Sequence, residues 1–316
     1  MNIFVTGACG YKGTVLVPKL LLAGHKVTAF DLMWFGNKLQ AHENLKVVQG
    51  DVRKIKDFSF EGFDAVIHLS SVANDPCGDL NPKLTWEISA LATMLLAENA
   101  YKYDINQFIY ASSGSVYGVK EEEDVTEDLD LEPISEYNKT KMISERVLLS
   151  YSDKMSIQIV RPATVCGYSP RMRLDVAVNM LTMQALTNQK ITVLGGDQTR
   201  PNIHIEDITD VYMHFLNDPT ITGIYNAGFE NISIIDIAHI IASEIDTEIF
   251  IKESNDPRSY RVNSDKLLST GFKPTKTVKD AIIEIKDLYE SGKLEDKNEF
   301  YNLKWMEEHK LYDLKD

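Results

Sequence analysis

The first thirteen residues constrain the fold more than any other stretch, because a short apolar run breaks there into a glycine-spaced turn. The run ends at Thr6, and three glycines follow at three-residue spacing: Gly7, Gly10 and Gly13. The first permits a tight turn, the second lets backbone N–H groups approach a diphosphate, and the third lets a helix pack close to the strand. An ordinary strand-to-helix turn can show the same spacing, so the remainder of the chain must decide.

Composition limits the class of protein and its partners. A chain of 316 residues with 44% hydrophobic content can bury a large core, as one big domain or two closely joined ones. A net charge of −14 without a basic stripe argues against nucleic acid and membranes as partners. Three widely spaced cysteines predict neither a disulfide framework nor a metal site. No signal peptide or membrane-length apolar run is recognisable, which predicts a cytoplasmic protein.

An acidic residue closes the second expected strand. Lys26–Phe30 is that strand, and Asp31 follows about 20 residues beyond the glycines, where a carboxylate can accept the ribose hydroxyls of a dinucleotide. A 2′-phosphate would meet Asp31 as a like charge, and the apolar segment Leu32–Phe35 supplies no arginine to offset it. This arrangement predicts NAD as the cofactor, in preference to NADP.

Six apolar segments alternate with helical patterns in the first half of the chain. Beyond the two strands already described, they are Leu45–Val52, Phe63–Ser71, the segment that begins at Gln107, and Ser156–Val160. This alternation predicts an α/β fold with a doubly wound parallel sheet, a Rossmann domain, over residues 1–167. We expect a smaller α/β substrate domain over 168–316, with segments around 200–228 returning to the first domain. Within the second domain, Ile191–Asp197 is expected to form a hairpin arm.

Polar side chains gather where later elements begin or end. Ser112 and Ser113 follow the fifth strand, at the edge where open α/β sheets bind ligands. Tyr137 and Lys141 begin the next helix, and their four-residue spacing puts both on one face. Spacing alone favours an exposed helical pair, whereas the glycine turn and the serine-rich strand end favour a catalytic pair. His68 is expected to be a packed strand-end residue.

A set of motifs occurs in a fixed order along the chain, from Met1 to about Gly271. They are Thr6-Gly7-x-x-Gly10-x-x-Gly13, Asp31, Gly50-Asp51-Val52, His68-Leu69-Ser70-Ser71, Ser112-Ser113-Gly114-Ser115-Val116-Tyr117-Gly118, Tyr137-x-x-x-Lys141, Arg161-Pro162 and Arg200-Pro201-Asn202-Ile203-His204-Ile205-Glu206-Asp207. Together they resemble the extended short-chain dehydrogenase/reductases, in the branch of nucleotide-sugar epimerases and dehydratases.

The resemblance implies a proton-transfer site built on Tyr137. The tyrosine would exchange a proton with a sugar hydroxyl, while NAD takes hydride from the same carbon. A free tyrosine has a pKa near 10, so its anion would need support from the Lys141 ammonium and the nicotinamide charge. Ser113 would hydrogen-bond the same sugar oxygen.

The resemblance also assigns binding roles. Cofactor contacts are expected from Gly7, Gly10, Tyr11, Lys12, Gly13, Asp31, Asp51, Val52, Leu69, Ser70, Ser71, Ser112, Tyr137, Lys141, Arg161 and Ala163. Arg200 and Arg258 fall where family members clamp the nucleotide diphosphate, a task suited to a planar fork of donors. The loop with Arg171 and Arg173 resembles that of some enzymes of heptose and bacterial surface-polysaccharide synthesis, although plain surface arginines are an equal alternative. Ser115 and Asn179 are further expected substrate contacts.

Residues that differ from the family pattern reduce the number of reaction types to be expected. Gly114 and Ser115 stand where 4,6-dehydratases carry an acidic pair, so no acid is in place there to protonate a departing hydroxyl. Ser89 replaces a usual asparagine, and Lys12 a usual apolar residue. We therefore expect an NAD-dependent nucleotide-sugar epimerase that works through transient C4 oxidation. The alternatives are a 4-dehydrogenase or 4-keto reductase, then a 4,6-dehydratase, and last a non-catalytic NAD-binding protein.

A homodimer is expected from surplus apolar surface on two helical segments. The Asn81–Tyr103 segment and the helix after Tyr137 carry more apolar residues than one sheet can cover. The residues in question are Trp86, Leu91, Leu95, Val147 and Leu148.

Overall fold

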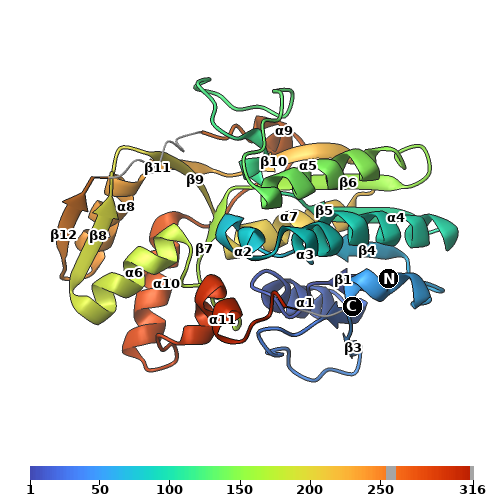
Figure 1. Ribbon diagram of the computed structural model, residues 1–316, viewed down its shortest axis with the longest axis horizontal. Helices are drawn as coiled ribbons and strands as arrows, with labels where there is room; N and C mark the ends of the chain where they lie inside the picture. Colours follow the sequence, from blue (N-terminus) through green and yellow to red (C-terminus); the bar gives the residue numbers. More distant parts are fainter. Residues whose placement is uncertain (254–260, 314–316) are drawn as a thin grey trace.

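A seven-stranded parallel sheet forms the larger lobe of the computed structural model, which describes residues 1–253 and 261–313 (Figure 1). The strands are β1 (Asn2–Thr6), β2 (Lys26–Asp31), β3 (Leu45–Gln49), β4 (Ala65–His68), β5 (Gln107–Ala111), β6 (Ser156–Pro162) and β10 (Gly223–Ala227). Their order is β10-β6-β5-β4-β1-β2-β3, and every pair is parallel. The predicted doubly wound fold is thereby confirmed. The order reverses between β1 and β4, the switch point where such sheets bind ligands.

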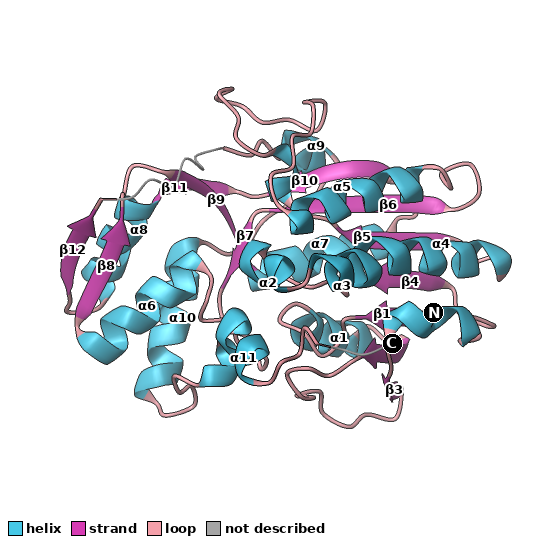
Figure 2. Ribbon diagram, in the orientation of Figure 1, coloured by secondary structure: helices cyan, strands magenta, loops and turns pink. Residues whose placement is uncertain are grey.

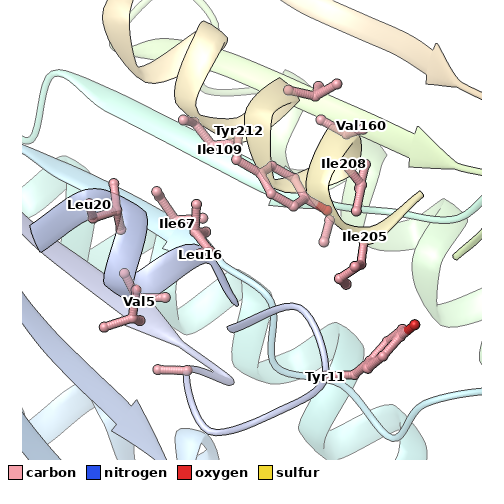
Figure 3. Close-up of a cluster of buried hydrophobic side chains, with 14 of the residues drawn as sticks. Val5, Tyr11, Leu16, Leu20, Ile67, Ile109, Val160, Ile205, Ile208 and Tyr212 are labelled. Atoms are coloured by element: carbon pink, nitrogen blue, oxygen red, sulfur yellow. The ribbon is translucent and has the colours of Figure 1, made fainter. Parts of the chain in front are cut away.

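Side chains of the central strand alternate between two helical layers, because successive strand residues point to opposite faces. Ile3 and Val5 pack against α1 (Gly13–Leu22) and α7 (Ile205–Asn217), and Figure 3 shows Val5 close to Leu16 and Leu20 of α1. Phe4 points the other way, into the cluster that contains residues of α4 (Ala92–Lys102) and α5 (Glu136–Leu149). Both faces of the sheet are therefore covered, as the apolar strands require.

The expected helix over Asn81–Tyr103 is built in three parts. α3 (Pro82–Trp86) leads through a π-helical turn at Glu87–Leu91 into α4. Before it lies the short α2 (Asp75–Leu80), which follows β4 at the edge of the sheet.

The smaller lobe has its own apolar core. Its helices are α6 (Ala177–Asn188), α8 (Ile234–Glu244) and α10 (Val278–Glu290), packed beside the strand pair β8 (Lys190–Leu194) and β12 (Glu248–Lys252) (Figure 2). The expected hairpin at 191–197 is wrong, because β8 pairs in parallel with β12. A parallel pair needs a long crossover, which here includes β9, α7, β10, β11 and α8.

A three-stranded sheet lies between the lobes in Figure 1. It consists of β11 (Glu230–Ser233), β9 (Thr199–His204) and β7 (Thr164–Cys166), in that order. β7 follows directly on β6 and β9 leads directly into α7, so the chain passes between the lobes here. The exact domain boundaries stay a prediction. The remaining helices are α9 (Asp265–Ser269) and α11 (Asn302–Glu308).

Candidate active site

A cavity of about 830 Å³ opens where β1 and β4 diverge, and both lobes line it. The first lobe contributes the glycine turn, Asp31, Asp51, Val52, the Leu69–Ser71 segment, Ser112, Ser113, Ser115, Tyr137, Lys141 and Ala163. The second contributes Arg171, Arg173 and Arg200. Arg258 lies outside the described residues. Sequence positions that are far apart thus meet at a single cavity.

The glycine turn leaves no room for side chains. Gly7 has a φ of +68°, and a Cβ there would lie 2.7 Å from the backbone nitrogen of Ser70. A Cβ on Gly13 would lie 2.4 Å from the carbonyl oxygen of Ala8. α1 begins at Gly13, so the N–H groups of its first turn come close to the cavity. Such a helix start suits a diphosphate.

Asp31 is fixed at the end of β2. Its Oδ2 accepts the backbone N–H of Cys9 at 3.0 Å, and its Oδ1 accepts the N–H of Met33 at 2.7 Å. Burial raises the pKa of Asp31, and the two N–H donors oppose that rise. The carboxylate lines the cavity at the position where dinucleotide-binding sheets hold the ribose hydroxyls. A dinucleotide therefore fits the residues that are present.

Ser113, Tyr137 and Lys141 come together on the opposite side of the sheet's switch point. The Lys141 amino group donates to the Ala111 carbonyl at 2.7 Å and lies 5.7 Å from the centre of the Tyr137 ring. Ser113 begins a 3₁₀ turn, and its hydroxyl is 2.7 Å from the Ser115 hydroxyl. Ser115 in turn donates to the side-chain oxygen of Asn138 on α5. These contacts hold Ser113 and Lys141 in place, and Ser113, Tyr137 and Lys141 all line the same cavity.

Two lysines share this region of the cavity. Burial lowers the pKa of Lys141 well below its usual range, and the charge of Lys12 lowers it further. Burial, and then the charge of Arg173, lower the pKa of Lys12 to about 8. Lys141 donates to the Ala111 carbonyl and is partly offset by the charge of Glu145, and Lys12 lies 3.4 Å from the Tyr212 hydroxyl. A bound anion would stabilise both ammonium groups further. The electrostatics favour an anionic ligand here.

The model of the NAD dependent epimerase/dehydratase family matches residues 3–228, which is more than half of the chain. The chain belongs to this family. Membership makes the protein an enzyme with NAD as its cofactor, and it agrees with the resemblance of the motifs.

The proteins to which this chain is similar are named for more than one activity. A putative UDP-glucose 4-epimerase of Methanocaldococcus jannaschii is 29% identical over 294 residues, which are 89% of this chain and 95% of that protein. UDP-glucuronic acid decarboxylase 1 of Xenopus tropicalis is 25% identical over 300 residues, 89% of this chain and 70% of that protein. The structure of a Thermotoga maritima UDP-glucose 4-epimerase with UDP-glucose superposes with a TM-score of 0.82 at 20% identity, covering 92% of this chain and 99% of that one.

Arg161, expected to contact the cofactor, points away from the cavity. Its guanidinium binds both carboxylate oxygens of Glu145, at 3.0 and 2.7 Å, and donates to the Tyr117 hydroxyl at 2.7 Å. Glu145 also accepts the hydroxyl of Ser112. We correct the expectation: Arg161 neutralises a buried carboxylate behind the serine-rich turn and does not line the cavity.

Asn179, expected to contact substrate, is used within the protein. Its side-chain oxygen accepts the N–H of Gly167 at 2.9 Å, and its amide donates to the Arg173 carbonyl at 2.9 Å. The amide also lies 3.0 Å from the Tyr11 hydroxyl, which itself donates to the Gly167 carbonyl at 2.6 Å. Asn179 is fully buried and does not line the cavity, so it joins the two lobes beside the glycine turn.

The two loop arginines have different surroundings. Arg173 forms a bidentate ion pair with Asp175, at 2.8 and 3.1 Å. Arg171 lies 3.8 Å above the Phe35 ring, and its charge interacts with that of Asp31. The side chain assigned to substrate therefore lies near the expected ribose position of NAD. Asp51 is likewise engaged, since its Oδ2 accepts from Arg53 at 2.7 Å.

Several lining residues were missed by the sequence reading. They are Trp34, Phe35, Asn74, Asp75, Asp79, Asp175 and Asn302. No motif marks them, although Trp34 and Phe35 follow Asp31 closely in the sequence.

Across the described residues, no cluster of three or more histidine, cysteine or acidic side chains could hold a metal ion. In the same ranges, none of the helices combines the length and the apolar character that a membrane crossing requires.

Proposed function

We propose that the protein is an NAD-dependent nucleotide-sugar epimerase. The observation that carries this proposal is that Ser113, Tyr137 and Lys141 line the same cavity as Asp31 and the glycine turn. A cofactor held by the turn and Asp31 would have its other end beside the proton-transfer group. A binding protein without turnover has no need for that arrangement.

The proposed chemistry begins at the C4 hydroxyl of the sugar. Lys141 stabilises Tyr137 as the phenolate, which takes the hydroxyl proton and becomes the neutral phenol, while Ser113 holds the sugar oxygen. NAD, when bound, supplies the hydride acceptor. After the keto sugar turns over, hydride returns to its other face, and Tyr137 gives the proton back. Atoms and electrons balance within one cycle, so no second redox partner is needed.

A nucleoside diphosphate sugar is the proposed substrate class. Similar proteins carry the names UDP-glucose 4-epimerase and UDP-glucuronic acid decarboxylase, which supports a UDP-sugar. Arg200 on β9 lines the cavity and is the proposed diphosphate contact from the second lobe. Arg258 stays a proposed second contact.

A one-way 4-dehydrogenase or 4-keto reductase is the second candidate, because it would use the same three side chains. Dehydration is less well supported. Gly114 and Ser115 offer no acid at the motif position, and a Cβ on Gly114 would lie 3.2 Å from the Pro162 carbonyl oxygen. Of the other carboxylates in the cavity, Asp75 accepts from Ser135 and Asp175 is paired with Arg173, and Asp79 is a further lining carboxylate away from the motif position.

Product analysis tests the reaction type. The protein with NAD would be incubated with UDP-, GDP-, CDP- and dTDP-sugars, and products would be analysed by mass spectrometry and nicotinamide absorbance. We expect an isomer of unchanged mass and no net reduced cofactor. A loss of about two mass units with accumulating NADH would establish the dehydrogenase instead, and a loss of about 18 would establish dehydration.

A further inference from the structure

The C-terminal helix α11 packs against the loop that follows Asp31. The indole N–H of Trp305 donates to the Trp34 carbonyl at 2.9 Å, and Asn81 donates to the Tyr312 carbonyl at 2.8 Å. Met306 is buried in the same apolar cluster as Trp34 and Phe35. Figure 1 shows the chain running from α11 toward the larger lobe. The segment is thus fixed at two hydrogen bonds and one apolar contact.

α11 also controls the position of Arg171. The side-chain oxygen of Asn302 accepts from the Arg171 guanidinium at 2.6 Å, and the Met172 carbonyl accepts from it at 2.9 Å. The backbone N–H of Asn302 donates to Asp175 at 3.1 Å. With the Phe35 ring on one face, the guanidinium is held by groups from three separate segments.

Arg171 is a buried cation without a carboxylate at ion-pair distance in the ranges 1–253 and 261–313. Removing such a charge from water is costly unless neighbouring groups compensate. Its compensation here comes from neutral oxygens and an aromatic face, and the more distant carboxylates of Asp175 and Asp31 add to it. Arg171, Phe35, Asn302 and Asp31 all line the cavity. The guanidinium is therefore set in place as a wall of that cavity.

We propose that Arg171, held by Asn302 and Phe35, forms the outer wall of the adenosine subsite, and that α11 is a fixed cover that slows NAD release. The family model ends at residue 228, so this part of the site is supplied by a segment beyond the matched region. An enzyme that regenerates its own NAD in each cycle gains from such retention, because the cofactor need not exchange.

The test measures NADH release from the purified full chain. Protein loaded with NADH is mixed with excess NAD, and the decay of NADH fluorescence gives the dissociation rate. Asn302→Ala should raise this rate about tenfold and Trp305→Phe about fivefold, because each removes one hydrogen bond of the cover. Glu307→Ala, an exposed change on the same helix, should stay within about twofold of the parent.

Release rates within about twofold of the parent in both variants would overturn the proposal. Trp305→Phe retains an aromatic ring, and thermal melting checks that each variant is folded. A second measurement locates the contact by competing ADP-ribose against NADH. In the Asn302→Ala and Trp305→Phe variants, the affinity for ADP-ribose should fall by the same factor as the affinity for NAD. An unchanged affinity for ADP-ribose would show that the adenosine end is not involved. Neither measurement uses a sugar, so the outcome is independent of the proposed reaction.

Discussion

Lys12 and Lys141 approach the reaction centre from different elements. Lys141 lies on α5 and donates to the Ala111 carbonyl, whereas Lys12 precedes α1 and lies 3.4 Å from the Tyr212 hydroxyl. An apolar residue is usual at the position of Lys12 in the family that the motifs resemble. A second ammonium beside the glycine turn therefore adds a charge that responds to pH.

Lys12 should make NAD binding depend on pH. Its pKa in the protein without ligand is about 8, and the cofactor diphosphate would raise it. The attraction is fully present below pH 8 and is lost as the pH rises, so the affinity should fall up to about tenfold per unit of pKa shift. Calorimetric titrations from about pH 6.5 to 9.5 would measure this, and Lys12→Met should show a smaller fall in affinity, with Lys141 as the remaining lysine whose pKa is lowered in the cavity. The same fall in Lys12→Met would exclude Lys12 as the cause.

Tyr137→Phe should reduce turnover by about 10²–10⁴-fold, because the proton-transferring oxygen is removed. NAD binding, followed by calorimetry, should remain nearly intact. Tyr225→Phe is a matched control, since the Tyr225 hydroxyl donates to the Thr222 carbonyl outside the cavity. Activity of Tyr137→Phe within about tenfold of the parent would contradict the proposed role.

At the scale of elements, the closeness of α1 to the β1 turn determines the shape of the phosphate site. Gly13→Ala places a Cβ 2.4 Å from a backbone oxygen, so α1 must shift. We expect the free energy of unfolding to fall by about 1–3 kcal/mol and NAD affinity to fall more than about tenfold.

Gly24→Ala serves as the comparison for Gly13→Ala. Gly24 has a φ of +82° and open space around it, so alanine there strains the backbone but leaves the turn intact. Denaturant melts and NAD titrations would be made on both. Equal loss of NAD affinity in the two variants would contradict the role of close packing at Gly13.

Local sequence patterns were sufficient to predict most strands of the large sheet and part of the candidate site. Buried parallel strands are short apolar runs bounded by turns, so β1 to β6 could be predicted along with the sheet type. β8 was expected as a strand, but its pairing could not be predicted, because its partner β12 begins 54 residues after β8 ends and much of β12 is exposed. The π-helical turn before α4 leaves no trace in the apolar spacing.

Side-chain direction and long-range contact explain the site residues that were misjudged. Pro162 lines the cavity, and since successive strand residues alternate, Arg161 points to the opposite side. A motif match does not reveal which neighbour faces the ligand. The contact between Arg171 and Asn302 joins residues 131 positions apart, and no periodicity in the sequence reports it.

At the scale of the whole molecule, α4 and α5 lie side by side on one face of the sheet with apolar residues turned outward. Leu91, Met94, Tyr101 and Ile143 are 45%, 41%, 49% and 37% exposed. Leu148, expected at this surface, is wholly buried instead, and the Trp86 indole donates to Glu136. The surplus apolar face is therefore composed differently from the expected one.

This face should join two copies of the chain. Light scattering at micromolar concentration should give the mass of a dimer, because association would bury the exposed apolar residues of these two adjoining helices. Met94→Asp together with Ile143→Asp should give a monomer, whereas Leu268→Asp on α9, also exposed and apolar, should leave the dimer intact. A parent protein of monomeric mass would rule out the interface.

The contact between Trp34 and Trp305 has a consequence for biosynthesis. The two residues are 271 positions apart, and a ribosome adds about 5–20 residues per second, so Trp305 follows Trp34 by roughly 15 to 55 seconds. The strands of the larger lobe precede residue 228 and can assemble within that interval. During it, the apolar loop beside Asp31 faces water. Cofactor bound by the nascent chain would shield this loop before α11 is synthesised and packs against it.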